Sequence, residues 1–353
     1  MDDGGIAVNI GGMRERHVVV VGGGLAGMAS AVWLAELGYA VTLLESNGAI
    51  GGRTIGLASK HGDAVENGQH VLAGSYAHTF RFLEAIGTRE LLEFPDEFGV
   101  RYPGGHAETF GFAPRNMTRM ALGRVRDLSI PTQLAALPAW ARLVRDVIRF
   151  DDSLDDITVD EWFDRLGFPA AVRRIMLNSM VIGLLNELPS LASAHAFAAL
   201  LRTGADRARR HGPDAVRIGY PTVDLGTFYT DAANRAMTQL GIDVRLRTRA
   251  VRVTVADGRA GGVELSDGST VAADAVVLAV PSWNLRALLD DVPGAEDIRL
   301  AAKQLEPIPI MNAYVLLDRP LGTVRVPMTQ PWGFMATASA AGSFAVEPQT
   351  KAG

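Results

Sequence analysis

The N-terminal part of the chain alternates short apolar runs with a helix-like segment. Residues 17–21 read HVVVV, a continuous β-branched run followed by glycines, which predicts a buried parallel strand. Residues 25–37 are rich in Ala and Leu and predict a helix that ends at Gly38. Residues 40–44 predict a second apolar strand, which ends at Glu45. Together these segments form a βαβ unit, the start of a doubly wound α/β fold.

From about residue 75 to residue 226, the pattern changes to helical periodicity interrupted by Pro and Gly. Apolar residues recur at helical spacing in 134–147 and in 170–185. Thr158, with Glu161 three positions later, forms a capping box at the start of another helix. The pattern therefore predicts a mainly helical insertion between two parts of the sheet.

Strand patterns return in residues 249–281, which alternate apolar and polar positions. Their two Asp-Gly pairs, at 257–258 and 267–268, predict the turns of a β-meander. The last apolar run, 275–280, is continuous, as expected of a strand that is buried on both faces. We therefore expect the sheet begun at the N-terminus to be completed after the helical insertion.

Composition and charge exclude several classes of protein. The 353 residues are 48% hydrophobic and 21% charged, which is inconsistent with intrinsic disorder. The net charge of −5 argues against a nucleic-acid-binding protein. The chain has no cysteine, so disulfides and cysteine-ligated metals are excluded, and no other pattern supports a metal site. Residues 1–16 lack the apolar core of a signal peptide, and no apolar run approaches the ~20 residues of a membrane span. This predicts a cytoplasmic protein, either soluble or peripheral on the inner face of the membrane.

The turn after the first strand, GGGLAG, matches the pattern G-x-G-x-x-G. Gly22 permits the tight turn, Gly24 lets a pyrophosphate approach the backbone, and Gly27 lets helix and strand pack closely. Glu45, at the end of the second strand, is placed to accept hydrogen bonds from ribose hydroxyls. The strand, turn, helix and acidic residue together predict a dinucleotide site.

The segment NGAIGGRT, directly after the second strand, narrows the identity of the predicted cofactor. Arg53 can neutralise a pyrophosphate from the side opposite the helix dipole, and Gly51 and Gly52 let the chain pass close to it. A G-x-x-G-G-R sequence after a GxGxxG unit resembles the flavoprotein superfamily of amine oxidases, phytoene desaturases and protoporphyrinogen oxidases. The resemblance implies tightly bound FAD.

The same resemblance implies roles for individual residues. Glu45 would hold the adenosine, and the backbone of Val251, on the first meander strand, would contact the adenine. The pyrophosphate would bind the glycine-rich turn and the segment after the second strand, that is Gly22, Gly24, Leu25, Ala26, Gly27, Gly51, Gly52 and Arg53.

Gly68 and Gln69 align with the superfamily segment that passes near the isoalloxazine ring. His70 follows them and is the candidate catalytic residue, because an imidazolium there could protonate a leaving hydroxyl. The alternative is a histidine that hydrogen-bonds this loop and holds its shape.

Four further segments, in the right order, narrow the resemblance to the squalene-associated FAD-dependent desaturases, the hydroxysqualene dehydroxylases of squalene and hopanoid biosynthesis. They are residues 65–76, 183–202, 219–248 and 316–320. This resemblance implies reduction of hydroxysqualene, an isoprenoid lipid, to squalene by hydride transfer from reduced flavin, with loss of the hydroxyl. It leaves the electron donor unidentified. The alternatives are a carotenoid or phytoene type FAD desaturase, an amine oxidase-like enzyme, or a catalytically inactive shortened FAD-binding protein.

The expected organisation is a Rossmann-like FAD-binding domain interrupted by a mainly helical substrate domain. Family members continue well past the position of Trp332, and a later segment closes over the flavin; we expect that segment to be missing here. The predicted parts are an N-terminal extension at 1–16, an FAD-binding domain at 17–75 and 227–290, a substrate domain at 76–226 and 291–335, and an irregular tail at 336–353.

Two arginine-rich stretches have two interpretations. They are either solvated, ion-paired faces or peripheral contacts with an anionic membrane, from which a lipid substrate would be collected. Their arginines are Arg115, Arg119, Arg124 and Arg126 in the first stretch and Arg202, Arg207, Arg209 and Arg210 in the second.

Overall fold

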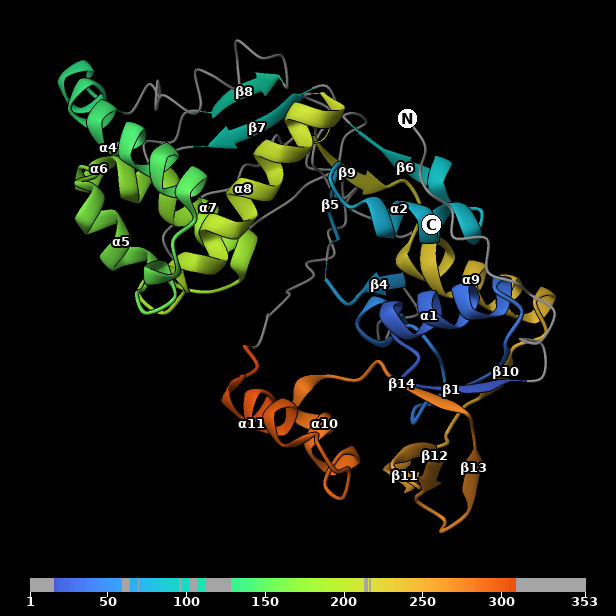
Figure 1. The fold of residues 1–353 in the computed structure, drawn as a ribbon. Coiled ribbons are helices and arrows are strands. Elements are labelled where there is room, and N and C mark those ends of the chain that lie inside the picture. The colour runs from blue at the N-terminus through green and yellow to red at the C-terminus, as the bar shows by residue number, and fades with distance from the viewer. Residues whose placement is uncertain are drawn as a thin grey trace. The chain divides into compact units, whose positions relative to one another are not determined.

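The structure, a computed structural model, describes residues 16–58, 64–68, 70–94, 97–101, 107–111, 128–212, 215 and 217–308. The chain divides into two compact units, which are coloured along the sequence in Figure 1. The first unit holds the described residues up to His70 together with His78–Leu92 and Pro221–Pro307. The second holds Val71–Ala77 and the described part of Glu93–Tyr220.

The first unit is built on a four-stranded parallel sheet with the order β10-β2-β1-β14. Val19 on β1 lies opposite Thr42 on β2 and Val276 on β14, so strands from both ends of the sequence share one register. The valines of β1 are buried because both faces of the sheet are covered, as the sequence pattern predicted. The strands are β1 (His17–Val21), β2 (Ala40–Leu44), β10 (Asp243–Arg245) and β14 (Ala275–Leu278).

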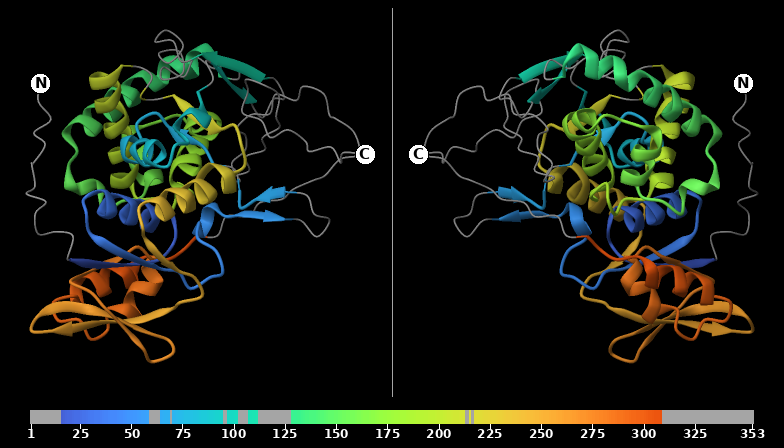
Figure 2. Two further views of the ribbon diagram at one scale, coloured as in Figure 1. Left: turned by 90° about the vertical axis from the view of Figure 1, so that its right-hand side faces the viewer. Right: turned by 90° about the vertical axis from the view of Figure 1, so that its left-hand side faces the viewer.

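Helices α1 (Leu25–Glu36) and α9 (Ala232–Gln239) cover one face of this sheet, and the meander covers the other (Figures 1 and 2). Val19 and Val21 share a hydrophobic core with Val253 and Val263 of the meander. Gly38 has a φ of 89° directly after α1, the left-handed conformation that ends a helix. The predicted βαβ unit is thus confirmed.

The meander consists of three antiparallel strands with the predicted turns between them. Asp257 and Gly258 have φ values of 49° and 72°, and two successive positive φ values are typical of a type I′ hairpin turn. Helices α10 (Ser282–Leu288) and α11 (Glu296–Gln304) follow β14. The three strands are β11 (Ala250–Ala256), β12 (Arg259–Leu265) and β13 (Thr270–Ala272).

The second unit is mainly helical, as predicted. Thr158 accepts a hydrogen bond from the Glu161 N–H while the Glu161 carboxylate accepts one from the Thr158 N–H, so the capping box is formed. The predicted helix at 170–185 is continuous but contains a π-turn at Arg173–Leu177. The helices are α4 (Ile130–Arg149), α5 (Val159–Leu166), α6 (Ala170–Val172), α7 (Asn178–Leu185) and α8 (Ala194–His211).

Short strands and one more helix complete the described structure. Helix α2 (Ala77–Ala85) lies almost wholly in the first unit. The remaining sheets are the pair β3 (Gly56–Ala58) and β4 (Ala64–Glu66), the pair β7 (Glu97–Arg101) and β8 (Ala107–Gly111), and a sheet with the order β5 (Leu72–Ala73), β9 (Ile218–Pro221), β6 (Leu92–Glu93).

The unit boundaries differ from the predicted domain boundaries. Residues 78–92 and 291–307 group with the parallel sheet, whereas the sequence pattern placed them in the substrate domain. On α2, the Arg81 guanidinium lies 5.5 Å from the Trp33 ring of α1, and Val292, after α10, packs against the core of sheet and meander. The predicted tail at 336–353 lies outside the described residues. No helix in the described part of the chain is both long and apolar enough to cross a membrane.

Candidate cofactor site

The turn from β1 to α1 requires glycine at its first motif position. Gly22 has a φ of 106°, a conformation that side chains rarely adopt. Its N–H donates to the Leu44 carbonyl at 2.8 Å, which joins the turn to the end of β2. A Cβ on Gly22 would lie 2.5 Å from the Ala279 carbonyl oxygen, so the residue after β14 approaches the turn too closely for any side chain.

The other two glycines of the motif differ in what surrounds them. A Cβ on Gly27 would lie 1.8 Å from the Gly22 carbonyl oxygen, because the first turn of α1 packs directly on the end of β1. Gly24, the N-cap residue of α1, has no described heavy atom within 4 Å of its Cβ position. The three glycines therefore fit the three predicted roles: turn, open approach and close packing.

The N-terminus of α1 presents backbone N–H groups beside Gly24. The Met28 N–H donates to the Gly24 carbonyl at 2.9 Å. Leu25 and Ala26 precede it as the first two helical residues, and the N–H groups of the first turn have no acceptor within a helix. These donors and the positive end of the helix dipole suit a pyrophosphate.

The G-G-R segment is joined to the glycine-rich turn through the backbone. The Gly51 N–H donates to the Gly23 carbonyl at 2.7 Å. A Cβ on Gly52 would lie 3.1 Å from the Gly24 Cα, and Gly51 and Gly52 both have positive φ, at 117° and 57°. Arg53 follows with an exposed side chain. The structure thus brings the predicted Gly51, Gly52 and Arg53 beside the N-terminus of α1.

Glu45 has a structural role that the sequence analysis missed. The residue is 6% exposed; its Oε2 accepts from the Gly23 N–H at 2.8 Å, and its Oε1 accepts from the Asn47 N–H at 2.7 Å. The residue therefore joins the glycine-rich turn to the chain after β2. A carboxylate oxygen can accept two hydrogen bonds, so Oε2 keeps capacity for the predicted ribose hydroxyl.

Val251 lies in a β-bulge. Ala250 is opposite Leu265 and Arg252 is opposite Glu264, which leaves Val251 as the extra residue of β11. The extra residue of a bulge is left out of the ladder, so its peptide groups suit the predicted adenine contact. The chain enters β11 beside Glu45, whose carbonyl accepts from the Thr248 N–H at 2.8 Å.

The segment predicted to lie near the flavin ring is described in part, since Gln69 lies outside the described residues. Gly68 is buried with a φ of 89°, and the Asn67 side chain donates to the Arg53 carbonyl at 3.2 Å. The His70 ring lies 6.4 Å from the Tyr229 ring.

The electrostatics of His70 alter its predicted role. Burial, and the nearby Arg53 charge, lower the pKa of His70 from its ordinary value of 6.5. The neutral imidazole is therefore favoured at neutral pH, which disfavours the imidazolium that the predicted acid role requires. Burial also raises the pKa of the neighbouring Tyr229 to about 12, so its hydroxyl stays protonated.

Thr230 is a further polar residue at the site, and the sequence analysis did not single it out. It lies on a π-turn, Gly226–Asp231, that packs on the Gly52–Thr54 turn. The residue is 8% exposed, and its Oγ1 forms no hydrogen bond within the described structure. A Cβ on Gly51 would lie 2.9 Å from that oxygen. No sequence signal marks it, because only the fold brings this turn to the glycines.

The described site residues fit an adenine dinucleotide. The open approach at Gly24, the first-turn N–H groups of α1, the Arg53 guanidinium and the bulge at Val251 all belong to the first unit. Within the described residues, no three His, Asp or Glu side chains lie close enough to hold a metal ion.

The chain resembles a known protein family and several curated proteins. The model of the family described as "Flavin containing amine oxidoreductase" matches residues 25–342. Among curated proteins, 15-cis-phytoene desaturase of Arabidopsis thaliana is 25% identical over an alignment of 323 residues, which covers 87% of this chain and 55% of the relative. Zeta-carotene desaturase of Synechocystis is 28% identical over an alignment of 316 residues, which covers 80% of this chain and 59% of the relative. The chain thus spans a little over half the length of these relatives.

Solved structures share the fold. An oxidoreductase from Methanosarcina mazei aligns with a TM-score of 0.61 and 17% identity, covering 82% of this chain and 66% of that one. A putrescine oxidase, solved with bound putrescine, aligns with a TM-score of 0.54 and 19% identity, covering 77% of this chain and 60% of that one. At these identities the likeness concerns the fold alone.

Proposed function

Because the chain belongs to the flavin containing amine oxidoreductase family, we propose that it is an FAD-dependent oxidoreductase that acts on a long isoprenoid lipid. Membership of this family makes FAD the cofactor. The observation that carries the proposal is the cradle formed by the open approach at Gly24, the N-terminus of α1 and the joined Gly51-Gly52 turn.

Each part of the cradle has a task in binding. The N–H groups of Leu25 and Ala26 would hold the pyrophosphate, and Arg53 would offset its second charge. Glu45 would accept from the ribose and the bulged backbone at Val251 would contact the adenine. When bound, FAD supplies hydride transfer.

The proposed substrate is hydroxysqualene. The reaction would replace a C–O bond with a C–H bond, consuming a hydride and a proton and releasing water; an unidentified electron donor would supply the reducing equivalents. The resemblance of residues 65–76, 183–202, 219–248 and 316–320 to hydroxysqualene dehydroxylases supports it. With its lowered pKa, His70 would act here through its neutral ring, as a hydrogen-bonding group rather than as a charged acid.

A carotenoid-type desaturase is the second candidate. It is supported by the phytoene and zeta-carotene desaturases among the relatives. This reaction runs in the opposite direction, since two hydrogens leave the substrate as a carbon–carbon double bond forms, and it needs an electron acceptor such as a quinone.

One set of assays separates these functions. The purified chain is reconstituted with FAD and given hydroxysqualene with dithionite, or phytoene with a quinone, and the products are analysed by mass spectrometry. Squalene in the first reaction supports the dehydroxylase, and additional double bonds in the second support the desaturase. A chain that carries flavin but converts neither substrate would be an inactive FAD-binding protein. A chain that binds no flavin would contradict the proposed function.

We also propose that the chain contacts a bilayer through helix α4. The first arginine-rich stretch lies outside the described residues, and in the second Arg209 pairs with Asp206 at 3.4 Å. On α4, large aliphatic side chains that are 42% to 73% exposed recur every three, four or seven residues, which places them along one side of the helix. They are Ile130, Leu134, Leu137, Val144 and Ile148.

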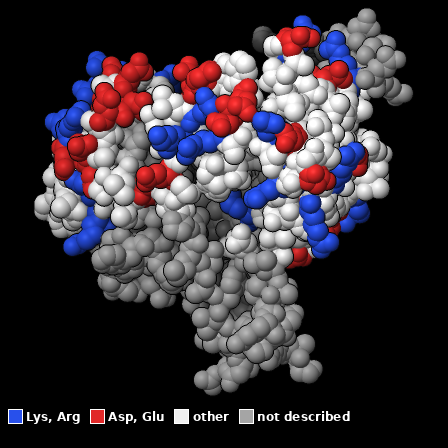
Figure 3. All heavy atoms as spheres, turned by 90° about the horizontal axis from the view of Figure 1, so that it is seen from below, with Lys and Arg blue, Asp and Glu red and all other residues white. Residues whose placement is uncertain are grey.

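Insertion of these apolar side chains into the bilayer should contribute more to this contact than attraction to charged lipids. An acidic run, DDSLDD at 151–156, follows α4 directly and would be repelled by anionic lipid. On the face drawn in Figure 3, which is seen from below, Lys and Arg are interleaved with Asp and Glu. We therefore expect the chain to float with neutral phosphatidylcholine vesicles, and Leu134→Asp with Ile148→Asp to abolish flotation. Leu240→Asp, at a position that is 39% exposed in the first unit, is the matched control. Flotation only with anionic vesicles, or unchanged flotation of the α4 variant, would contradict contact through α4.

A further inference from the structure

Arg252 directly follows the bulged residue Val251. It is the first residue of β11 after the bulge to resume the ladder, and it lies opposite Glu264 on β12. The residue pairs on either side of a bulge determine which residue of the bulged strand has no partner on the opposite strand. The contacts of Arg252 therefore decide whether Val251 stays the extra residue.

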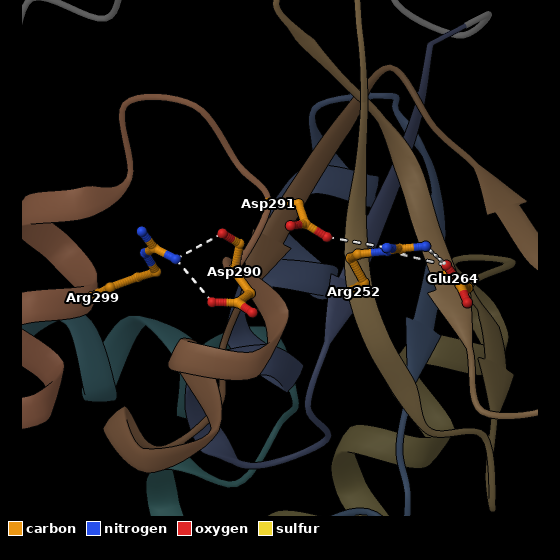
Figure 4. A network of polar contacts seen from close by, with 5 residues as sticks. All are labelled: Arg252, Glu264, Asp290, Asp291 and Arg299. Atoms are coloured by element: carbon orange, nitrogen blue, oxygen red, sulfur yellow. Dashed lines mark hydrogen bonds and ion pairs between the residues drawn. The ribbon is translucent and has the colours of Figure 1, made fainter.

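The Arg252 guanidinium binds two carboxylates from different parts of the chain (Figure 4). Its Nε donates to Glu264 Oε2 at 3.1 Å, and its Nη2 donates to the same oxygen. Its Nη1 donates to Asp291 Oδ2 at 3.1 Å. Asp291 lies between α10 and α11, so one side chain connects β11, β12 and the connection between these helices.

The position of Asp291 is fixed in turn. Arg299 of α11 donates from Nη1 to the Asp290 carbonyl at 2.6 Å and to the Asp290 carboxylate at 2.9 Å (Figure 4). The Arg252 and Asp291 side chains are 47% and 67% exposed, and ion pairs in such positions add little to the free energy of unfolding. Their effect is therefore expected to be local, on the backbone that Arg252 shares with the bulge.

We propose that Arg252 is a positioning residue for the adenosine end of FAD: its bridge to Glu264 and Asp291 holds the bulge at Val251. The inference rests on the proposed FAD site. Arginine suits this task because its planar fork donates in two directions at once, whereas a lysine presents a single point charge.

The test compares FAD with ADP, which contains the same adenosine diphosphate half. We expect Arg252→Gln to weaken the binding of both ligands to the flavin-free chain by the same factor, about threefold to fivefold, with an unchanged melting temperature. Asp291→Asn should have the same kind of effect, and Arg252→Lys should be intermediate. Arg209→Gln breaks an exposed pair of similar type, with Asp206 on α8, and should leave both affinities unchanged.

Three results would overturn the inference alone: unchanged affinities in Arg252→Gln, a loss for FAD without a loss for ADP, or a lowered melting temperature that accounts for the loss. A wild-type chain that binds neither FAD nor ADP would contradict the proposed function itself and this inference with it. The two failures are therefore distinguishable.

Discussion

Two alanine substitutions in the glycine-rich turn, three residues apart, are expected to change the stability of the flavin-free chain in opposite directions. Gly27→Ala should destabilise it, because the new methyl group would lie 1.8 Å from the Gly22 carbonyl oxygen. Gly24→Ala should stabilise it slightly, because the methyl group would meet no described atom within 4 Å and the φ of −75° suits any residue. The cofactor, by contrast, should bind both variants less well.

The magnitudes follow from the contacts. Ordinary contact with a Cβ begins at 3.4 Å, so Gly27→Ala forces the first turn of α1 away from the Gly22 backbone. Overpacking costs about 1–3 kcal/mol, and a backbone clash belongs at the upper end. At about 2–4 °C per kcal/mol, the melting temperature should fall by roughly 6–12 °C. Gly24→Ala restricts the unfolded chain without strain, which stabilises by about 0.4–1 kcal/mol and raises the melting temperature by about 1–4 °C.

The assay is a thermal melt of each flavin-free variant followed by titration with FAD. Gly24→Ala should bind FAD at least about tenfold more weakly, a loss of about 1.4 kcal/mol, because its methyl group occupies the approach to the helix N-terminus. A fall in melting temperature for Gly24→Ala as large as that for Gly27→Ala would refute the assignment of open space. Unchanged FAD affinity in Gly24→Ala would refute the location of the pyrophosphate.

Three further predictions test single side chains. Arg53→Ala should weaken FAD binding about tenfold, measured by flavin retention after gel filtration, and unchanged occupancy would remove Arg53 from the pyrophosphate site. Because the folded-state pKa of His70 lies below 6.5, the unfolded chain takes up this proton first as the pH falls. The free energy of unfolding should therefore decrease as the pH falls from 6.5 to the lower folded-state pKa of His70. Denaturant melts of His70→Gln should show a smaller decrease over this pH range. A decrease equal to that of the wild-type chain would contradict the lowered pKa. Thr158→Ala should cost about 1 kcal/mol in the same melts through loss of the capping box, with Thr158→Ser close to wild type.

The features that could be predicted from sequence are those that neighbouring residues dictate. The β-branched run of β1, the glycine at the end of α1 and the Asp-Gly turn at 257–258 each specify their conformation locally, and all three were confirmed. The turn between β1 and α1 was also predicted at the right position, because strand, turn and helix follow one another without interruption.

The features that escaped prediction depend on segments far apart in the chain. The bulge at Val251 exists only relative to β12, and the burial of Thr230 beside Gly51 needs a π-turn that begins at Gly226. The grouping of residues 291–307 with the first unit was not foreseen, because their ordinary helical pattern does not reveal that Val292 packs against the core of sheet and meander.

The cofactor cradle is held in shape by hydrogen bonds within the protein, and this affects how tightly the chain can bind FAD. The Gly22 N–H reaches the Leu44 carbonyl, the Gly23 N–H reaches the Glu45 carboxylate, and the Gly51 N–H reaches the Gly23 carbonyl. Each bond joins a segment that would otherwise be a mobile loop to the end of β2 or to the neighbouring turn. Ordering loops on binding subtracts from affinity, so a cradle that is already ordered leaves more of the pyrophosphate and adenosine contacts available for holding FAD. Glu45 contributes to binding in two ways, since the carboxylate that is predicted to hold the ribose also holds the turn that is proposed to bind the phosphates.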